Sequence, residues 1–294
     1  MQTIDIKNRI SRFIFTLMIL ASSQARAEAE EISWVLLNFP PLMRLDLNKE
    51  GETNMDHASG PMAELQRELV KALPQYKHRY QVVSFRRAKK LFESKGGFCT
   101  ILFLENKDRS EYLYFGDSIA TTIPPGLITH RKNEARLNVK PGSYVDLEQL
   151  LKTQDFQLGV VNGRSFSPRI DEAMGGSRKP VYQMVINEAM GSLFKMLNSE
   201  RVDGVLAYYL ELAEEQERNP ASRDLQFYQL KQDHTSISLP VSCERSQWGK
   251  KTLGKVSLAV KDESVKAKLT ALVKQTLLMD RPKRSEEPTP TLLR

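Results

Sequence analysis

The sequence has few of the residues that bind metals or act as nucleophiles. Its 294 residues include two cysteines and four histidines. No spacing among them matches a zinc site, because the histidines stand apart from one another and from the cysteines: His57, His78, His130 and His234. A G-x-S-x-G nucleophile motif is also missing. These absences predict a protein that is not an enzyme and that binds no metal and no cofactor.

A clustered basic surface is missing as well. The chain carries 43 Lys and Arg against 36 Asp and Glu, a net charge of +7. Residues 1–27 hold four of these basic residues and one acid, so about +4 remains on the rest, where it is scattered. Nucleic-acid binding requires basic residues gathered on one face with aromatic residues between them. The charge therefore favours a small anionic or zwitterionic ligand over nucleic acid.

Long apolar runs are absent from the body of the chain, and the one short run is at the amino terminus. Basic residues precede an apolar stretch at residues 13–21, and Ala25-Arg26-Ala27 follows it. This order is typical of a cleavable signal peptide. The run is too short for a helix of ~20 residues that spans a bilayer. We expect residues 1–27 to be removed and the protein to be periplasmic; an uncleaved anchor is the alternative.

The two cysteines, Cys99 and Cys243, form an isolated pair. In an exported protein such a pair usually forms a disulfide. Each lies beside an apolar run, at residues 100–104 and 237–241. Closing a loop of this length contributes up to ~5 kcal/mol in the chain-entropy model. Two buried free thiols remain the alternative.

Apolar runs and helical patterns alternate along the chain. Strands at 33–37, 80–85 and 99–104 are separated by a helix that begins at Pro61 and a helix at 86–94. This β-α-β-α-β order predicts a mostly parallel sheet. The other expected strands are 112–115, 127–130, 157–161, 181–184, 225–230, 237–241 and 258–260, and residues 201–207 are expected to form a turn that leads into a buried strand. The other expected helices are 146–151, one from Pro168, one capped by Asn187, 209–218 and 265–278. Loops are expected at 45–59 and 133–142, and a disordered tail at 281–294.

The segment at residues 98–125 provides the first candidate site residue. Its apolar run ends abruptly in a charged turn at residues 105–109, which predicts a strand buried on both faces. Arg109 then follows the carboxyl end of this strand. Ligands bind at that edge of open α/β sheets. Without further context, a solvated surface residue is the better explanation of Arg109, because most arginines after a strand are solvated.

Four stretches together resemble the type 2 periplasmic solute-binding proteins of the polar amino-acid family. The resemblance as a whole covers about residues 32–279, and each of the four motifs is loose when taken alone. The stretches are Asn38-Phe39-Pro40-Pro41-Leu42; Asn106-Lys107-Asp108-Arg109 with Tyr114-Phe115 and Ser118; residues 157–165; and residues 197–206. They look like the family's aromatic-Pro turn, its T-x-x-R…F-S segment, its strand and turn opening the second lobe, and its L-x-x-G-r-x-D-a-x-l segment.

The resemblance implies a two-lobed α/β fold of the periplasmic-binding-protein type 2. Each lobe would be a mostly parallel sheet flanked by helices, and two hinge strands would join the lobes. Lobe one would comprise residues 31–123 plus 238–280, and lobe two residues 124–237. Cys99 and Cys243 would then lie in the same lobe, which supports their pairing.

The resemblance also implies roles for individual residues. Arg109 corresponds to an arginine that clamps a ligand carboxylate, for which its planar fork is suited. Ser165 and Phe166 correspond to a turn whose N–H groups meet the same carboxylate, although this turn also fits a plain helix cap. Phe39 corresponds to an aromatic residue that packs on the ligand, with core packing as the alternative. Asn106 replaces a Thr that hydrogen-bonds the carboxylate.

Tyr208 departs from the family pattern. It occupies the position of an Asp that grips the ammonium group of α-amino acids in relatives, and a phenol carries no such charge near neutral pH. Asp203 lies in the preceding turn and is a poor substitute. Leu102 and Leu104 also stand where relatives often have serine. A monoanion, or a cyclic, aromatic or peptide-like carboxylate, is therefore as well supported as an α-amino acid.

The expected function is that of a monomeric, non-catalytic binding protein. It would close its lobes around a small carboxylate ligand and serve an inner-membrane ABC permease. A sensory module of the same fold and a structural envelope protein without a ligand are the alternatives. The acids at residues 211–217 show the spacing of a solvated helix face, so they provide no desolvated carboxylate pair for catalysis.

Overall fold

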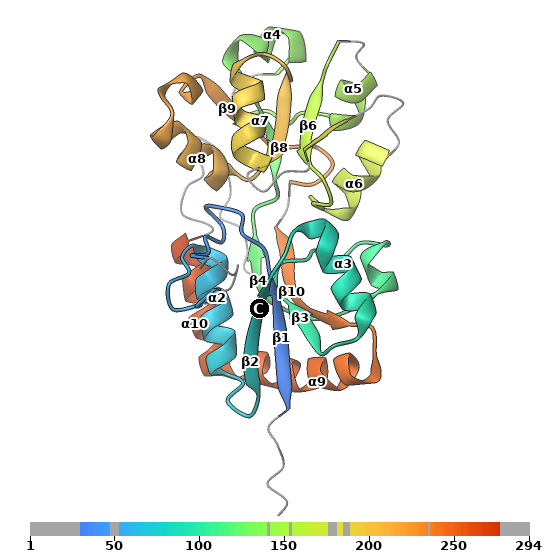
Figure 1. Cartoon of the computed structure of the whole chain (residues 1–294). Helices are drawn as coiled ribbons and strands as arrows, with labels where there is room; N and C mark the ends of the chain where they lie inside the picture. Colours follow the sequence, from blue (N-terminus) through green and yellow to red (C-terminus); the bar gives the residue numbers. More distant parts are fainter. Residues whose placement is uncertain are drawn as a thin grey trace, which may run out of the picture.

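The computed structural model describes residues 30–47, 53–139, 142–152, 155–175, 181–184, 189–234 and 236–276. The chain forms two lobes, each built on a five-stranded sheet with helices on both faces (Figure 1). The expected signal peptide, the tail at 281–294, the cap at Asn187 and the end of the last helix lie outside the described residues. None of the helices in the described part of the chain has the length and apolar character needed to cross a bilayer.

The sheet of the first lobe has the strand order β2-β1-β3-β10-β4. These strands are β1 (Glu31–Leu36), β2 (Lys77–Val82), β3 (Phe98–Thr100), β4 (Leu113–Thr122) and β10 (Ile237–Glu244). The helices are α2 (Pro61–Lys71), α3 (Phe85–Ser94), α9 (Gln247–Lys261) and α10 (Glu263–Thr276). β1 runs parallel to β2 and β3, whereas β10 runs antiparallel to β3 and β4. Four of these five strands therefore run in the same direction, and β10 runs against them, so the sheet is mostly parallel with one antiparallel strand.

Both faces of the first sheet are buried, as the continuous apolar run of β1 indicates. Ile32, Trp34 and Leu36 point towards α2, α9 and α10 and form one core with them. Val35, on the other face, packs with Phe92 of α3. Alternate residues of a strand point to opposite faces, so β1 contributes to both cores. Figure 1 shows α2 and α10 side by side on one face and α3 on the other.

The sheet of the second lobe repeats this arrangement with the order β7-β6-β8-β5-β9. Its strands are β5 (Gly126–His130), β6 (Leu158–Val161), β7 (Tyr182–Met184), β8 (Gly204–Ala207) and β9 (Leu225–Tyr228). Its helices are α4 (Glu134–Leu137), α5 (Leu147–Lys152), α6 (Pro168–Gly175), α7 (Ala189–Asn198) and α8 (Tyr209–Arg218). β6 is parallel to β7 and β8, and β5 is antiparallel to β8 and β9.

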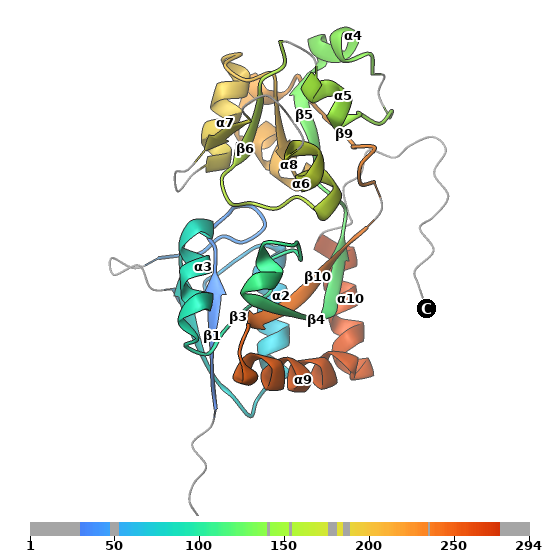
Figure 2. The same cartoon turned by 90° about the vertical axis from the view of Figure 1, so that its right-hand side faces the viewer.

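The chain passes between the sheets twice. At the first sheet, the strand that leads out to the second lobe lies beside the strand that returns from it. β4 leads through residues 123–125 into β5, and the segment after β9 returns to β10. Thr122 at the end of β4 pairs with Ile237 at the start of β10. Figure 2 shows β4 and β10 next to each other in the first lobe, with β5 and β9 in the second.

The strand expected at 258–260 is wrong, because these residues belong to α9. Ser246 caps this helix by accepting a hydrogen bond from the Gly249 N–H at 3.0 Å. The buried residues Leu253, Val256 and Val260 recur at helical spacing, whereas Leu258 is 74 % exposed. A short apolar run does not distinguish a strand from part of a helix. The loop expected at 133–142 is also wrong in part, because α4 begins at Glu134.

The strand expected at 99–104 ends early, and this shapes the space between the lobes. β3 stops at Thr100, whose hydroxyl accepts a hydrogen bond from the Leu102 N–H at 3.1 Å. Such a local bond between a side chain and the backbone competes with strand pairing. The chain therefore bends out of the sheet, and the apolar residues after Thr100 leave it and run towards the second lobe.

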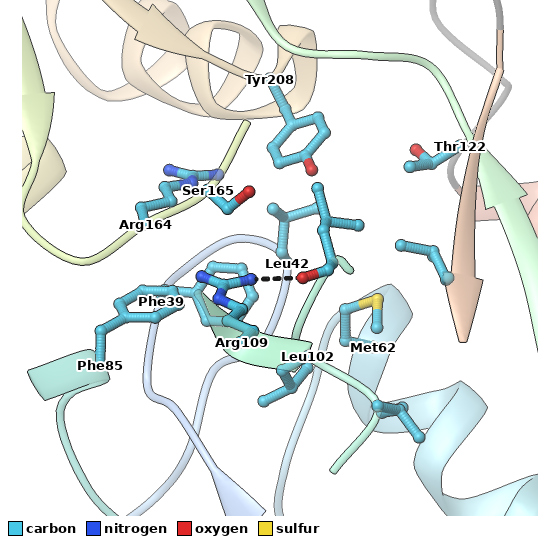
Figure 3. Close-up of a pocket in the computed structure, with 13 residues that line it drawn as sticks. Phe39, Leu42, Met62, Phe85, Leu102, Arg109, Thr122, Arg164, Ser165 and Tyr208 are labelled. Atoms are coloured by element: carbon cyan, nitrogen blue, oxygen red, sulfur yellow. Dashed lines mark hydrogen bonds between the residues drawn. The ribbon is translucent and has the colours of Figure 1, made fainter. Parts of the chain in front are cut away.

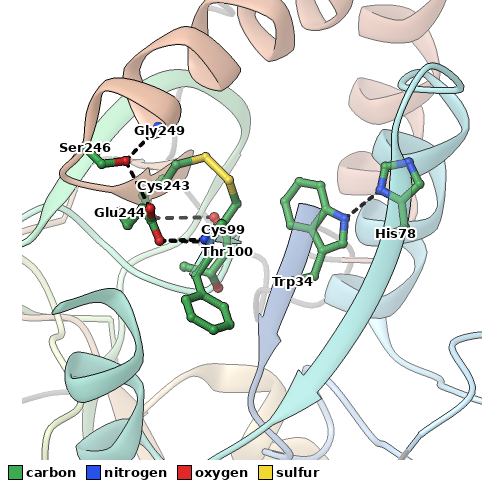
Figure 4. Close-up of a disulfide and its surroundings, with 11 residues drawn as sticks. Trp34, His78, Cys99, Thr100, Cys243, Glu244, Ser246 and Gly249 are labelled. Atoms are coloured by element: carbon green, nitrogen blue, oxygen red, sulfur yellow. Dashed lines mark hydrogen bonds between the residues drawn. A yellow bond between two sulfur atoms is a disulfide. The ribbon is translucent and has the colours of Figure 1, made fainter. Parts of the chain in front are cut away.

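The predicted disulfide between Cys99 and Cys243 is present in the structure and links β3 to β10. The two residues are register partners on these neighbouring strands, although 144 positions separate them. The buried carboxylate of Glu244 accepts bonds from the N–H groups of Gly97 and Phe98, each at 3.0 Å (Figure 4). The disulfide and this carboxylate together fix the start of β3 against the end of β10.

We expect loss of the disulfide to lower the free energy of unfolding by up to ~5 kcal/mol, because a long loop becomes unconstrained in the unfolded chain. Urea denaturation with and without reductant measures this loss. The Cys99→Ala/Cys243→Ala variant should match the reduced wild type and show no response to reductant. An oxidised and a reduced wild type of equal stability would contradict the prediction.

A buried indole and a histidine form a second polar contact in the first lobe. The Trp34 Nε1–H donates to His78 Nδ1 at 2.9 Å, and His78 Nε2 lies 3.0 Å from the Leu73 carbonyl oxygen (Figure 4). Both contacts are satisfied by the neutral ring with its proton on Nε2. Burial lowers the pKa of His78, against a smaller opposing effect of the Leu73 carbonyl.

Because the pKa of His78 is lower in the folded state, the unfolded chain binds this proton first as pH falls. The stability contributed by His78 is therefore present above the unfolded pKa of about 6.5 and is lost below it. Urea midpoints at pH 7.5 and pH 5.5 should show this loss. His78→Gln should reduce the difference, whereas the exposed His57→Gln control should retain it. An unchanged difference in His78→Gln would exclude this residue as the cause.

Candidate functional site

A small cavity of about 40 Å³ lies between the lobes. It is lined from the first lobe by Phe39, Leu42, Met62, Phe85, Ile101, Leu102, Leu104, Arg109, Thr122 and Leu239, and from the second lobe by Arg164, Ser165 and Tyr208 (Figure 3). Hydrogen bonds that join the lobes beside this cavity, such as the one from Arg109 to the Gly163 carbonyl, show that the lobes are in contact around it.

The turn after β1 places aromatic and aliphatic side chains on the cavity. Phe39 and Met43 exchange backbone hydrogen bonds at 2.9 and 3.2 Å, and this short ladder fixes the turn. The ring of Phe39 lies 6.2 Å from that of Phe85 at the start of α3. Phe39 is among the residues that line the cavity, and its place in the sequence predicts an aromatic contact with a ligand.

Arg109 lies in a 3₁₀ turn (Arg109–Glu111) and is 4 % exposed. Its Nη1 donates to the Leu104 carbonyl at 2.9 Å and its Nη2 to the Gly163 carbonyl of the second lobe at 3.1 Å. Its guanidinium also lies 4.5 Å from the ring centre of Phe103. Burial lowers the pKa of Arg109, although a guanidinium stays protonated in proteins.

The charge of Arg109 has no carboxylate partner at ion-pair distance within the described ranges. Two of its five N–H groups donate to carbonyl oxygens. Carbonyl dipoles and an aromatic face stabilise the cation but do not neutralise it. Arg109 therefore remains a buried positive charge on the wall of the cavity.

The expected carboxylate-binding groups do meet a carboxylate, but it belongs to Asp171 of α6. The Ser165 hydroxyl donates to Asp171 Oδ2, and the Phe166 N–H donates to Oδ1 at 2.9 Å. Asn106 of the first lobe donates to Oδ2 at 3.3 Å. The Phe166 side chain packs in the core of the second lobe and not on the cavity. These three donors therefore bond to a carboxylate of the protein itself and not to a ligand.

Tyr208 lines the cavity from the second lobe, between β8 and α8 (Figure 3). Its backbone N–H donates to Glu211 Oε2 at 2.8 Å, which satisfies one free donor at the start of α8. Burial raises the pKa of the Tyr208 hydroxyl to about 12. The phenol is therefore neutral near pH 7.

Glu211 corrects the prediction of a solvated face at residues 211–217, because it is 2 % exposed. Its two oxygens accept from Nη1 and Nη2 of Arg164, each at 2.9 Å. Burial opposes the charge on Arg164, but Glu211 outweighs this effect and raises the pKa of Arg164. The guanidinium lies 5.0 Å from the Tyr208 ring and 5.8 Å from the Phe39 ring. A buried ion pair therefore forms the second-lobe wall.

Sequence reasoning missed Arg164, Glu211 and Asp171. Glu211 follows Tyr208 by three positions at the start of a helix, and this capping-box spacing was the available signal. Asp171 lies in the first turn of α6, where acids are favoured by the helix dipole. Nothing in the sequence marked Arg164 beyond its place next to Ser165.

Direct contacts across the cleft hold the lobes together. Arg109 bonds to Gly163, and Asn106 bonds to Asp171. Near the surface, Arg44 of the first lobe pairs with Glu214 of α8 at 2.8 Å. Gly163 has φ +78°, and a Cβ there would lie 3.1 Å from the Phe85 Cβ. The absence of a side chain at Gly163 thus permits this close approach.

Comparison of the sequence with protein-family models and with curated proteins finds no match. Solved structures do match. An ancestral arginine-binding protein bound to arginine has a TM-score of 0.62 and 15 % identity, covering 85 % of this chain and 98 % of its own. An amino acid ABC transporter substrate-binding protein, AbpA from Streptococcus pneumoniae, bound to L-arginine, has a TM-score of 0.60 and 17 % identity, with coverage of 85 % and 95 %.

A solute receptor for L-cysteine of Neisseria gonorrhoeae is similar to the same degree. Its TM-score is 0.59 at 17 % identity, with coverage of 84 % and 90 %. Identities this low establish a shared fold. The chain has the two-lobed fold of amino-acid ABC transporter substrate-binding proteins, as the sequence motifs predicted.

We expect Glu211→Gln to lower the free energy of unfolding by about 3–5 kcal/mol, because it leaves the buried Arg164 charge without a partner. The control is Glu217→Gln, an exposed acid on the same helix, which should change stability by less than about 0.5 kcal/mol. Arg164→Met/Glu211→Met, which removes both charges, should recover part of the loss. Urea denaturation measures all three variants. Equal effects of Glu211→Gln and Glu217→Gln would contradict a structural role for the pair.

Proposed function

We propose that this protein is a non-catalytic solute-binding protein that closes its two lobes around a small carboxylate-bearing ligand. The observation that carries the proposal is Arg109, a buried cation without a carboxylate partner in the described residues, on the cavity between the lobes. A guanidinium fork binds a carboxylate through two parallel hydrogen bonds. A ligand carboxylate would supply the counter-charge that Arg109 lacks.

Closure of the lobes would complete the site. Arg109 belongs to the first lobe, yet it bonds to the Gly163 carbonyl of the second. Tyr208 and Ser165 reach the cavity only from the second lobe. A ligand that bridges the lobes would therefore favour the closed form, and hinge closure around a ligand is a recurrent switching motion.

The names of the fold neighbours support a role with a transporter. Several are substrate-binding proteins of amino-acid ABC transporters, so we assign this chain a transporter permease as its partner. A periplasmic location would follow from residues 1–27 acting as a signal peptide. The lobes would comprise residues 31–123 plus 238–280 and residues 124–237, and the protein would act as a monomer.

A binding role also agrees with the state of the acids near the cleft. Glu211 accepts two hydrogen bonds from Arg164 and one from the Tyr208 N–H. General acid–base catalysis requires a group within reach of the substrate that can gain or lose a proton. A carboxylate held by a buried guanidinium is poorly suited to that role.

The test is a thermal-shift screen of amino acids, small organic acids and short peptides. A ligand at a hundredfold excess over its Kd should stabilise the protein by ~2.7 kcal/mol. Arg109→Gln should abolish the shift, and Arg109→Lys should weaken it because an ammonium cannot reproduce the planar fork. The exposed Lys107→Gln, two positions away, is the charge-matched control and should retain the shift.

Two results would contradict the proposal. A carboxylate whose binding is the same in Arg109→Gln and in wild type would place the site elsewhere. A screen in which no acid, amino acid or peptide stabilises the folded protein would oppose a solute-binding role for this cleft.

A further inference from the structure

We propose that the ligand is a monoanionic acid with an apolar body and no ammonium group. This inference rests on the proposed function and names the chemical class of its ligand. The acids beside the cleft, Asp171 and Glu211, each already accept three hydrogen bonds from protein donors, whereas Arg109 retains N–H groups that bond to no described residue. The cleft thus offers donors to an anion and no charged acceptor to a cation.

Asp171 is the first acid that an ammonium group could have used. Its Oδ1 accepts the Phe166 N–H, and its Oδ2 accepts both the Ser165 hydroxyl and the Asn106 amide. These donors come from both lobes, so closure of the lobes adds the hydrogen bond from Asn106 to those that Asp171 already accepts. Ser165 lies on the cavity wall, whereas Asp171 is not among the residues that line it.

Glu211 is the second acid, and it is equally engaged. Arg164 donates a hydrogen bond to each of its oxygens, and the Tyr208 N–H also donates to Oε2. The Glu211 side chain is 1 % exposed, and the groups that reach the cavity are its partners Arg164 and Tyr208. An ammonium group in the cavity would therefore meet a guanidinium instead of the carboxylate behind it.

The described residues that line the cavity include no Asp or Glu. Their charged members are Arg109 and Arg164, and their hydroxyl groups belong to Thr122, Ser165 and Tyr208. A positive charge on the ligand would be repelled by the Arg109 guanidinium in a site of low dielectric constant, whereas the charge of Arg164 is compensated by Glu211. A single negative charge next to Arg109 would be stabilised by the same environment.

The rest of the cavity wall is apolar and favours a ligand whose uncharged part is apolar. Phe39, Leu42, Met62, Phe85, Leu102 and Leu239 are among the side chains that surround the polar groups. Burying apolar ligand surface against them is favourable, whereas a second polar group would lose water without gaining a partner. An acid with an aliphatic or aromatic body matches this wall.

The experiment compares acids with the amino acids that differ from them only by the ammonium group. The pairs are acetate and glycine, 4-methylpentanoate and L-leucine, and 3-phenylpropanoate and L-phenylalanine, with 3-phenylpropanamide as the uncharged reference. Calorimetric titration of the full chain should give at least one acid a Kd tenfold or more below that of its amino acid. The amide should bind at least tenfold more weakly than 3-phenylpropanoate.

A variant pair tests whether the hydrogen bonds from Arg164 to Glu211 cause the preference for an acid over its matched amino acid. Arg164→Gln frees this carboxylate and should improve the affinity for the amino acid, relative to its matched acid, by tenfold or more. Arg164→Gln/Glu211→Gln has the same loss of arginine but no carboxylate, and should show no such gain. Circular dichroism of both variants identifies a loss of fold, and in that case the wild-type ligand pairs decide the question.

The outcomes separate this inference from the function beneath it. Amino acids that bind through Arg109 as tightly as their matched acids, or more tightly, would overturn the inference and leave the solute-binding function in place. Failure of every acid and amino acid to bind would overturn both. Tenfold preference for an acid, abolished in Arg109→Gln but retained in Lys107→Gln, would support both.

Discussion

Two guanidinium groups are buried where the lobes meet, and the need to compensate their charge determines how the cleft is built. A buried charge is strongly unfavourable unless it is paired or well hydrogen-bonded. Arg164 meets this need inside its own lobe, through the two oxygens of Glu211. Arg109 meets it only in part, through carbonyls from both lobes and the face of Phe103. The difference between the two arginines separates a structural ion pair from a group that can still accept a counter-ion.

The position of Arg109 depends on how the chain leaves the first sheet. β3 has three residues, and its start is fixed by the disulfide to Cys243 and by the carboxylate of Glu244. The Thr100 hydroxyl then ends the strand by bonding to the Leu102 N–H. Leu102 and Leu104 are thereby directed to the cavity instead of extending the sheet. The rigid base and the early exit together carry the arginine to the second lobe.

Much of this architecture could be predicted from local sequence patterns. The bounds of α8, the start of α2 at Pro61 and the pairing of the two cysteines were all expected correctly. Period-two and period-3.6 patterns and caps act over a few residues, so a single sequence reveals them. The strand expected at 258–260 failed because three apolar positions fit either period.

The charges of the cleft could not be predicted in the same way. Arg164 and Glu211 are 47 positions apart, and Asn106 and Asp171 are 65 positions apart. The first pair forms when the second lobe has folded, and the second pair forms only when the two lobes have also met, so no local pattern reveals either. From sequence alone, Glu211 resembled its neighbours on an acidic helix. Its burial follows from a partner that belongs to another part of the chain.

A shared fold therefore does not determine the ligand. The backbone that forms the turn at Ser165 and Phe166 can hold an anion, because its N–H groups lie at the start of α6. In this chain the anion is the Asp171 carboxylate, three positions after the helix begins. A carboxylate built into the helix occupies these donors, so they are not free for a ligand. Its negative charge also acts to raise the pKa of Arg109. The same backbone with a neutral residue at 171 would offer those donors to a solute. Side chains on a common scaffold thus decide which charges the cleft accepts.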